Sequence, residues 1–251
     1  MSSDRQRDLM PAGGSLPSPH PRDAHGRGAA ALLRLLTWLS PAYPVGGYSY
    51  SHGLEWLVET GAVRDVETLV RWLEDLLAYG AGRSDLILLA ESWRAVASGD
   101  RQALKGVAEL AAAFASSAER RLETLAQGTA FLAATRVAWP KPELDALVAE
   151  APQVAYPVAV GASAAAHGLP LAETAQAYAQ AWVANLVSAA VRLVPLGQSA
   201  GLRTLAGLEP YIPRVSEAAL AARLEDVGGA AIAADIASMR HETQYTRLFR
   251  S

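Results

Sequence analysis

Apolar residues recur at helical spacing along almost the whole chain, and this spacing limits the fold more than any other feature. The clearest case is RDVETLVRWLEDLLAYG, residues 64–80, where leucines and valines form one stripe and charged residues the opposite face. No run alternates apolar and polar residues, and no Asn-Gly hairpin turn occurs. With 51% hydrophobic residues, a sizeable core can form. We therefore predict an all-α fold, a single-domain bundle of about nine or ten helices over residues 29–251.

The N-terminal stretch differs from the rest in composition. Residues 1–28 are rich in proline, glycine, serine and mixed charge, and lack the apolar run of a secretory signal. We predict a disordered tail there. His20 and His25 lie in it, so a weak metal site is the alternative to a solvated tail. The absence of cysteine, together with the absence of a signal, favours a cytoplasmic location.

Several classes of function lose support from what the chain lacks. The formal net charge of -3 gives no indication of nucleic-acid binding. The motifs of a phosphate-binding loop, a zinc protease and a nucleophile elbow do not occur. The most apolar stretch, residues 181–194, is shorter than the ~20 residues of a membrane span and contains Arg192. We expect no catalytic residues, no cofactor, no bound metal and no membrane contact.

The stretch SPAYPVGGYSYSHGLE, residues 40–55, combines stiff prolines, flexible glycines and three tyrosines. Tyrosine offers a large apolar face and a hydroxyl at little cost in side-chain entropy, as binding surfaces require. The residues that we expect to bind a partner are Pro44, Gly46, Tyr48, Ser49, Tyr50, His52 and Glu55. Two alternatives stay open: a Ser49, His52, Glu55 triad of an all-α hydrolase, and a helix start that a serine caps.

The C-terminal stretch MRHETQYTRLFRS, residues 239–251, combines arginines with aromatic and aliphatic residues, the types that carry binding energy at interfaces. We interpret it as a segment that becomes ordered on a partner; the alternative is a terminus docked on its own domain. The candidate residues there are Arg240, His241, Glu242, Gln244, Tyr245, Arg247, Leu248, Phe249 and Arg250. A third candidate is Gln198, where a helix restarts after RLVPLG; the alternative there is a plain turn.

Taken together, SPAYPVGGYSYSHGLE, AAVRLVPLGQ and MRHETQYTRLFRS resemble the urease accessory protein F family. The similarity also runs through SSAERRLETLAQGTAFL and YPVAVGASAAAHGLPLAETAQAYAQAWVANLV, and covers about residues 30–251. Any one of these motifs is moderately specific, and their order along the chain is strongly so.

The resemblance implies an all-α homodimer without enzymatic activity, which acts in nickel delivery during urease maturation. Members of the family bind a second accessory protein, called D or H, and recruit the GTPase accessory protein G to apo-urease. The match implies that residues 240–251 become ordered on the D/H protein and help to dock the G protein. The region leading into residues 40–55 is implicated in the same complex. Direct nickel binding by His52 or His241 is a further alternative.

Overall fold

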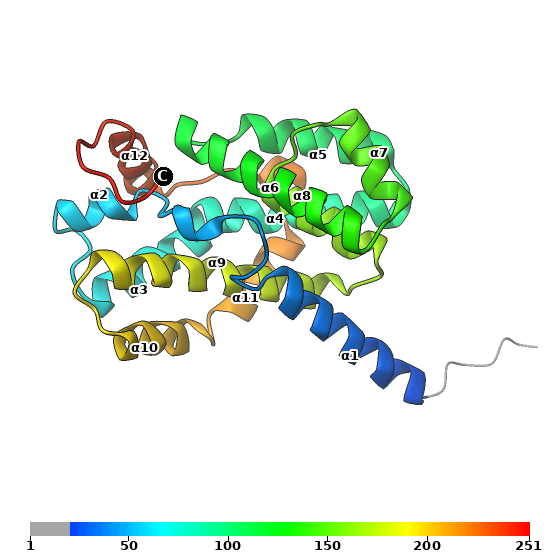
Figure 1. Ribbon diagram of the computed structural model, residues 1–251, viewed down its shortest axis with the longest axis horizontal. Coiled ribbons are helices and arrows are strands. Elements are labelled where there is room, and N and C mark those ends of the chain that lie inside the picture. The colour runs from blue at the N-terminus through cyan, green and yellow to red at the C-terminus, as the bar shows by residue number, and fades with distance from the viewer. Residues whose placement is uncertain (1–20) are drawn as a thin grey trace, which may run out of the picture.

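A computed structural model describes the backbone of residues 21–251 and the side chains from residue 28 onward. The described residues form twelve α-helices and two short 3-10 helices, with no β-strand among them (Figure 1). In chain order they are α1 Pro21–Trp38, η1 Gly47–Ser49, α2 Leu54–Glu59, α3 Val66–Tyr79, α4 Ala81–Ser98, α5 Arg101–Ala113, α6 Ala118–Ala138, α7 Pro142–Glu150, α8 Tyr156–Ala166, α9 Leu171–Leu193, α10 Gln198–Leu208, α11 Ile212–Ala221, η2 Leu224–Asp226 and α12 Ile232–His241.

The all-α prediction is confirmed, and the helices outnumber the nine or ten expected because several are short. α2 has only 6 residues and α7 only 9. α1 begins at Pro21, before the predicted end of the disordered tail at residue 28, and the rest of that tail lies outside the described residues. The division of the chain at residue 28 stays a prediction. None of the described helices is long and apolar enough to cross a membrane.

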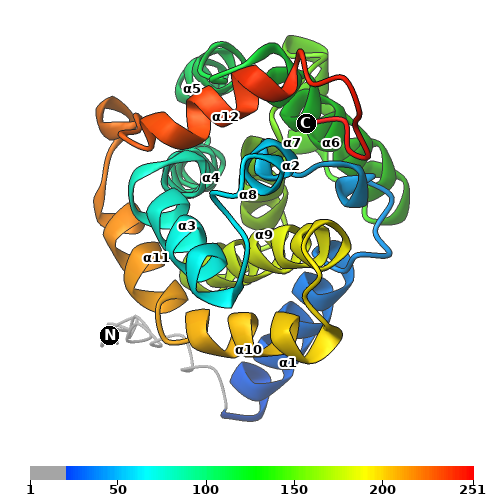
Figure 2. The ribbon, with the colours of Figure 1, turned by 90° about the vertical axis from the view of Figure 1, so that its left-hand side faces the viewer.

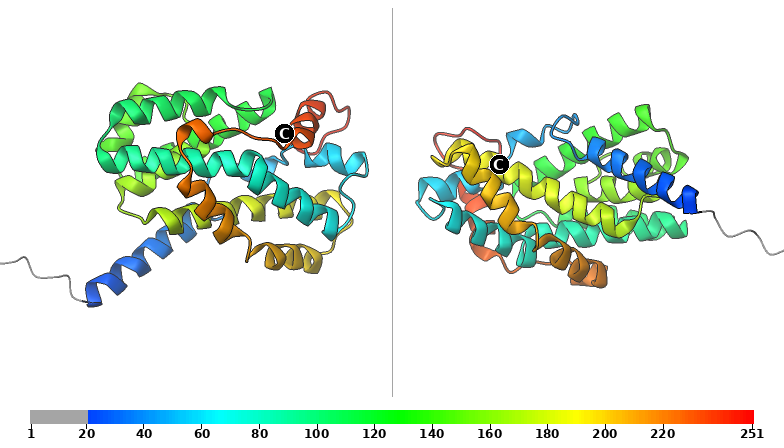
Figure 3. Two further views of the ribbon diagram at one scale, coloured as in Figure 1. Left: turned by 180° about the vertical axis from the view of Figure 1, so that it is seen from behind. Right: turned by 90° about the horizontal axis from the view of Figure 1, so that it is seen from below.

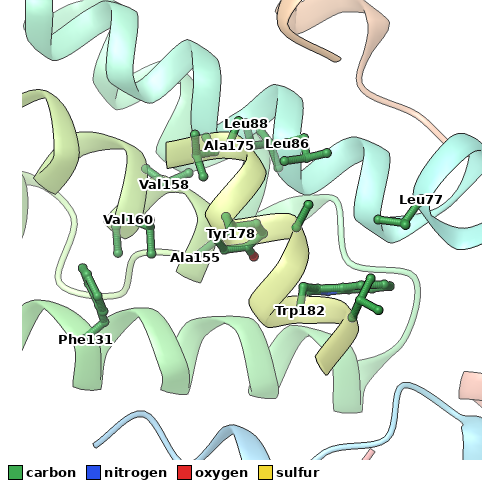
Figure 4. Close-up of a cluster of buried hydrophobic side chains, with 14 of the residues drawn as sticks. Leu77, Leu86, Leu88, Phe131, Ala155, Val158, Val160, Ala175, Tyr178 and Trp182 are labelled. Carbon is green, nitrogen blue, oxygen red and sulfur yellow. The ribbon is translucent and has the colours of Figure 1, made fainter. Parts of the chain in front are cut away.

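The core lies where α4 and α8 pack against each other, and Figure 2 shows α8 surrounded by the other helices. The close approach depends on Gly161, because a Cβ there would stand 2.2 Å from the carbonyl oxygen of Leu89. α9 adds Tyr178 and Trp182 to this core, and α6 adds Phe131 (Figure 4). The alanine-rich composition of residues 156–166 therefore has a packing role: small side chains let neighbouring helices come close.

The helix starts follow from local hydrogen bonding. Asp65 caps α3 by accepting a hydrogen bond from the amide of Thr68 at 2.9 Å, and the amide of Asp65 in turn donates to the Thr68 hydroxyl oxygen at 3.2 Å. Ser117 caps α6 in the same manner, through the amide of Arg120. The Ser117 cap sets the start of α6, whose first turns carry Glu119, Arg120 and Glu123.

The chain ends differ in their surroundings. Seen from behind and from below, α1 projects away from the other helices (Figure 3). The C-terminal residues instead follow α12 back across the molecule, beside α2 and α6 (Figures 1 and 2). This return brings the last residues of the chain next to residues 47–55.

Candidate functional site: a surface built from two distant segments

Residues 49–51 and 250–251 are hydrogen-bonded to each other through their backbones. The amide of Ser51 donates to the carbonyl of Ser251 at 2.7 Å, and the amide of Arg250 donates to the carbonyl of Ser49 at 2.8 Å. The hydroxyl of Ser51 also donates to the Ser251 carbonyl, at 2.5 Å. Two of the stretches singled out in the sequence, about 200 residues apart, thus form one site.

The loop that enters α2 requires an unusual backbone. His52 has a φ of 57°, a left-handed conformation that side-chain-bearing residues rarely adopt, and Gly53 follows with a φ of 77°. Gly53 also lies against α12: a Cβ there would be 2.7 Å from the backbone nitrogen of Ser238. The pair of left-handed residues turns the chain into α2, and the missing side chain lets α12 pack on that turn.

Glu55, in the first turn of α2, accepts hydrogen bonds from the C-terminal segment. Its Oε1 accepts from the amide of Leu248 at 2.7 Å, and its Oε2 from the amide of Phe249 at 3.0 Å. The Nε2 of His241 lies 3.2 Å from the same Oε2. Glu55 is only 8% exposed, so these bonds to a buried carboxylate are charge-assisted and little screened.

The N-terminal turn of α6 provides a second set of contacts to the C-terminal segment. Glu119 lies between the Nδ1 of His241, at 2.7 Å, and the guanidinium of Arg247, at 2.6 Å. Glu242 accepts from the amide of Ala118 at 2.8 Å, where the helix dipole favours a negative charge. Residues 241–247 are therefore fixed to the start of α6.

One turn further along α6, Glu123 joins the two segments. Its Oε1 lies 2.8 Å from the Nε2 of His52, and its Oε2 accepts from the hydroxyl of Ser251 at 2.7 Å and pairs with Arg120. Burial alone would raise the pKa of Glu123, but Arg120, His52 and these hydrogen bonds lower it to about 2. Burial and the charge of Arg120 lower the pKa of His52 in spite of Glu123.

A cavity of about 170 Å³ lies beneath this site, lined by His52, Arg120, Glu123 and Trp182 among others. Asp85 of α4 reaches it too, and accepts a hydrogen bond from the Tyr178 hydroxyl at 2.8 Å. Burial raises the pKa of Asp85 to about 6, although Arg120 and Tyr178 act in the opposite direction. The site therefore rests on a group of ionisable side chains that come from two helices, α4 and α6, and from the loop before α2.

The hydrolase alternative is wrong in its geometry. His52 pairs with Glu123, so its Nε2 does not face Ser49, and Glu55 binds the backbone of residues 248–249 and His241. Ser49 takes part through its carbonyl oxygen. A triad needs the acid aimed at the base and the base at the nucleophile, and neither contact forms here.

The metal alternatives gain no support from the part of the chain that the structure describes. Residues with described side chains contain no group of three or more His, Cys, Asp or Glu placed to bind a metal ion. The ring nitrogens of His241 face two carboxylates, and His52 faces one. The prediction for His20 and His25 lies outside the described side chains.

The C-terminal segment is docked on its own chain, as in the alternative interpretation; that it becomes ordered on a partner stays a prediction. The buried carboxylates of α2 and α6 supply the attachment that the sequence did not reveal. Of its predicted binding residues, His241, Gln244 and Phe249 are buried. Arg240, Tyr245, Arg247, Leu248 and Arg250 are exposed, and Tyr245 is fully so.

Residues 40–55 likewise contain both exposed and buried candidates. Tyr48 is 68% exposed, whereas Tyr50, His52 and Glu55 are buried. Pro44 is exposed, and Gly46, with a φ of 72°, immediately precedes η1. Gln198 is exposed at the first residue of α10 and makes none of the contacts described above.

Four residues important to this arrangement were missed in the sequence: Glu119, Arg120, Glu123 and Arg192. A signal for the carboxylates was present, since Glu119, Glu123 and Gln127 recur every four residues and so share one helix face. Arg192 gave no such signal. Its guanidinium lies 4.4 Å from the centre of the Phe249 ring and donates to the carbonyl of Tyr48 at 2.9 Å.

Comparison with known proteins decides the family. The sequence model of the UreF family matches residues 63–209, more than half of the chain. The chain belongs to the UreF family. It is 52% identical over 230 residues to the urease accessory protein UreF of Bradyrhizobium diazoefficiens, covering 91% of this chain and 95% of that protein. It is also 55% identical over 235 residues to UreF of Xanthobacter autotrophicus, with coverage of 91% and 97%.

Membership confirms the resemblance seen in the sequence and makes the chain a urease accessory protein, not an enzyme. The matched range 63–209 begins after residues 40–55 and ends before residues 239–251. The roles of the individual site residues in this UreF-family chain therefore stay predictions.

Proposed function

We propose that this chain is a scaffold in urease maturation, which together with a D/H-type accessory protein recruits the G-type GTPase to apo-urease for nickel insertion. Nickel is the cargo of this assembly, and the hydrolysis of GTP belongs to the G protein. The chain acts as a homodimer in the cytoplasm, as the family resemblance implies. A scaffold favours the partner conformations that it binds best, because only differential affinity shifts an equilibrium.

One observation supports the proposal most directly: exposed aromatic, aliphatic and cationic side chains lie on segments whose backbone is hydrogen-bonded to the rest of the chain. Tyr48, Tyr245 and Leu248 are 68%, 103% and 66% exposed, and Arg250, two residues after Leu248, is exposed as well. Tyrosine and arginine are the residue types most enriched among those that dominate binding energy. Large exposed side chains on an ordered terminus are typical of a contact surface rather than of a frayed chain end.

Partner binding tests the proposal. We expect Tyr245→Ala and Arg250→Ala each to weaken the complex with the D/H-type protein and the G protein by ~1–4 kcal/mol, because exposed anchors are lost. Removal of residues 242–251 should abolish the complex while the helical circular-dichroism signal remains. The measurement is co-purification with both partners, followed by isothermal titration.

Arg203→Ala is the matched control, because Arg203 is also exposed but lies on α10. It should bind both partners like the wild type. A chain lacking residues 242–251 that still assembled the complex and activated urease in a reconstituted mixture would contradict the proposal. Light scattering on the isolated chain separately checks the homodimer.

A further inference from the structure

The carboxylates that bind the C-terminal segment are buried within the chain. Glu55 and Glu123 are 8% and 2% exposed, and Glu119 has a side chain only 14% exposed. From the sequence, Glu55 is predicted to contact a partner. Its burial within the chain indicates a different role.

The bonds of Glu55 determine the conformation of the segment. One carboxylate accepts from two consecutive amides, those of Leu248 and Phe249, at 2.7 and 3.0 Å. The two side chains then take opposite directions: Leu248 is 66% exposed, and Phe249 is 4% exposed beneath the guanidinium of Arg192. The outward position of Leu248 is thus tied to the carboxylate of Glu55.

Tyr48, which is also exposed, is connected to the C-terminal segment through Arg192. Arg192, which covers Phe249, also donates to the carbonyl of Tyr48 at 2.9 Å, and the amide of Arg250 donates to the carbonyl of Ser49 at 2.8 Å. Tyr48, Leu248 and Arg250 are therefore oriented through one connected set of contacts. A free peptide of residues 239–251 would lack all of the contacts to α2, α6 and residues 48–51.

We infer that Glu55 is a positioning residue, which shapes the C-terminal segment so that a partner binds a composite surface of Tyr48, Tyr245, Leu248 and Arg250. This inference deepens the proposed function and rests on it for the identity of the partner. Glu55 itself does not contact the partner. The composite surface offers large, mostly apolar side chains together with the guanidinium of Arg250, and its complement is an apolar pocket edged by a carboxylate.

Glu55→Gln tests the positioning role in the full-length chain without a partner. Glutamine has nearly the same shape, but only one of its two terminal atoms accepts a hydrogen bond, so one amide loses its acceptor. We expect the amides of residues 248 and 249 to exchange hydrogen at least about tenfold faster, while the amides of α4 and α8 keep their protection. Glu67→Gln, on the exposed face of α3, is the matched control and should leave both unchanged.

A second variant removes the donor of the hydrogen bond instead of the acceptor, and it keeps the test valid if Glu55→Gln fails to fold. Leu248→Pro removes the amide that bonds to Oε1 of Glu55, while the side chain it replaces is exposed. It should speed exchange at residue 249 in the same way. Unchanged exchange at residues 248 and 249 in Glu55→Gln, or at residue 249 in Leu248→Pro, overturns the inference.

Affinity for the D/H-type accessory protein gives the second readout. Glu55→Gln should raise the Kd about tenfold or more, and a synthetic peptide of residues 239–251 should not compete with the wild-type chain. Faster exchange with an unchanged Kd, or effective competition by the peptide, overturns the composite surface. If the wild-type chain binds no D/H-type protein, the proposed function fails instead, and the exchange measurements still decide the role of Glu55.

Discussion

Neighbouring residues near the C-terminus have opposite environments, and this difference decides what each one does. Phe249 is 4% exposed and packs under Arg192, whereas Leu248 beside it is 66% exposed. Both are large apolar residues in a stretch rich in arginine, so composition assigns them the same role. In the folded chain Phe249 attaches the segment to the molecule, and Leu248 remains available to a partner.

We expect Phe249→Ala to release the C-terminal segment without unfolding the chain. Loss of a buried phenylalanine ring costs ~3–5 kcal/mol in a protein core, and at a chain end the cost falls on local docking. Carboxypeptidase should therefore remove the last residues much faster from this variant than from the wild type. Leu248→Ala is the adjacent control and should stay as resistant as the wild type. Equal digestion of both variants would contradict the assignment.

At the scale of elements, the site depends on how α12 packs on the turn before α2. Gly53 combines a φ of 77° with contact against the backbone of residues 237–238, within α12. The contact brings His241, at the end of α12, over Glu55 and Glu119. The direction of the C-terminal segment is thus set by one helix–turn contact.

Gly53→Ala should displace α12. The added Cβ would stand 2.7 Å from the nitrogen of Ser238 and would also strain the left-handed backbone, so we expect a loss of about 2 kcal/mol or more in the free energy of unfolding. Urea denaturation measures this loss. Gly207→Ala, where a Cβ meets nothing within 4 Å, is the control and should be nearly neutral. A Gly53→Ala chain of wild-type stability would show that the close contact is absent in solution.

At the scale of the whole molecule, buried charges beneath the site make stability depend on pH. Burial raises the pKa of Asp85 from 3.8 to about 6, so the folded chain binds this proton more tightly than the unfolded chain does. The contribution of Asp85 to stability is therefore largest below about pH 4 and is lost as the pH rises through 6. Glu123, with a pKa lowered to about 2, has the opposite effect: its contribution is full above about pH 4.5 and is lost toward pH 2.

Asp85→Asn should remove the loss of stability between about pH 4 and pH 6. The asparagine oxygen still accepts from the Tyr178 hydroxyl, but nothing at this position titrates. We expect the free energy of unfolding of the wild type to fall by on the order of 2 kcal/mol across this range because of Asp85, and that of the variant to lack this fall. Denaturant titrations at a series of pH values measure the difference. Asp75→Asn, on the exposed side of α3, is the control and should keep the wild-type dependence of unfolding free energy on pH. The same wild-type dependence in Asp85→Asn would contradict the prediction.

The helical class and the family could be read from the amino-acid sequence, and so could two segments of unusual composition. Helical spacing and turn residues act over a few positions, so RDVETLVRWLEDLLAYG could be assigned to the helix that forms at Val66–Tyr79. The unusual composition of residues 40–55 and 239–251 was equally visible. Local patterns could not reveal that these stretches meet.

Which candidates are exposed and which are buried depends on tertiary packing. Glu55 and His52 looked like members of a triad because they are spaced three residues apart, yet their partners are the amides of residues 248–249 and Glu123. Those partners lie 71 to 194 residues away in the chain. Burial and hydrogen bonding between segments so far apart arise only when α2, α6 and α12 pack together, and no local spacing encodes that packing.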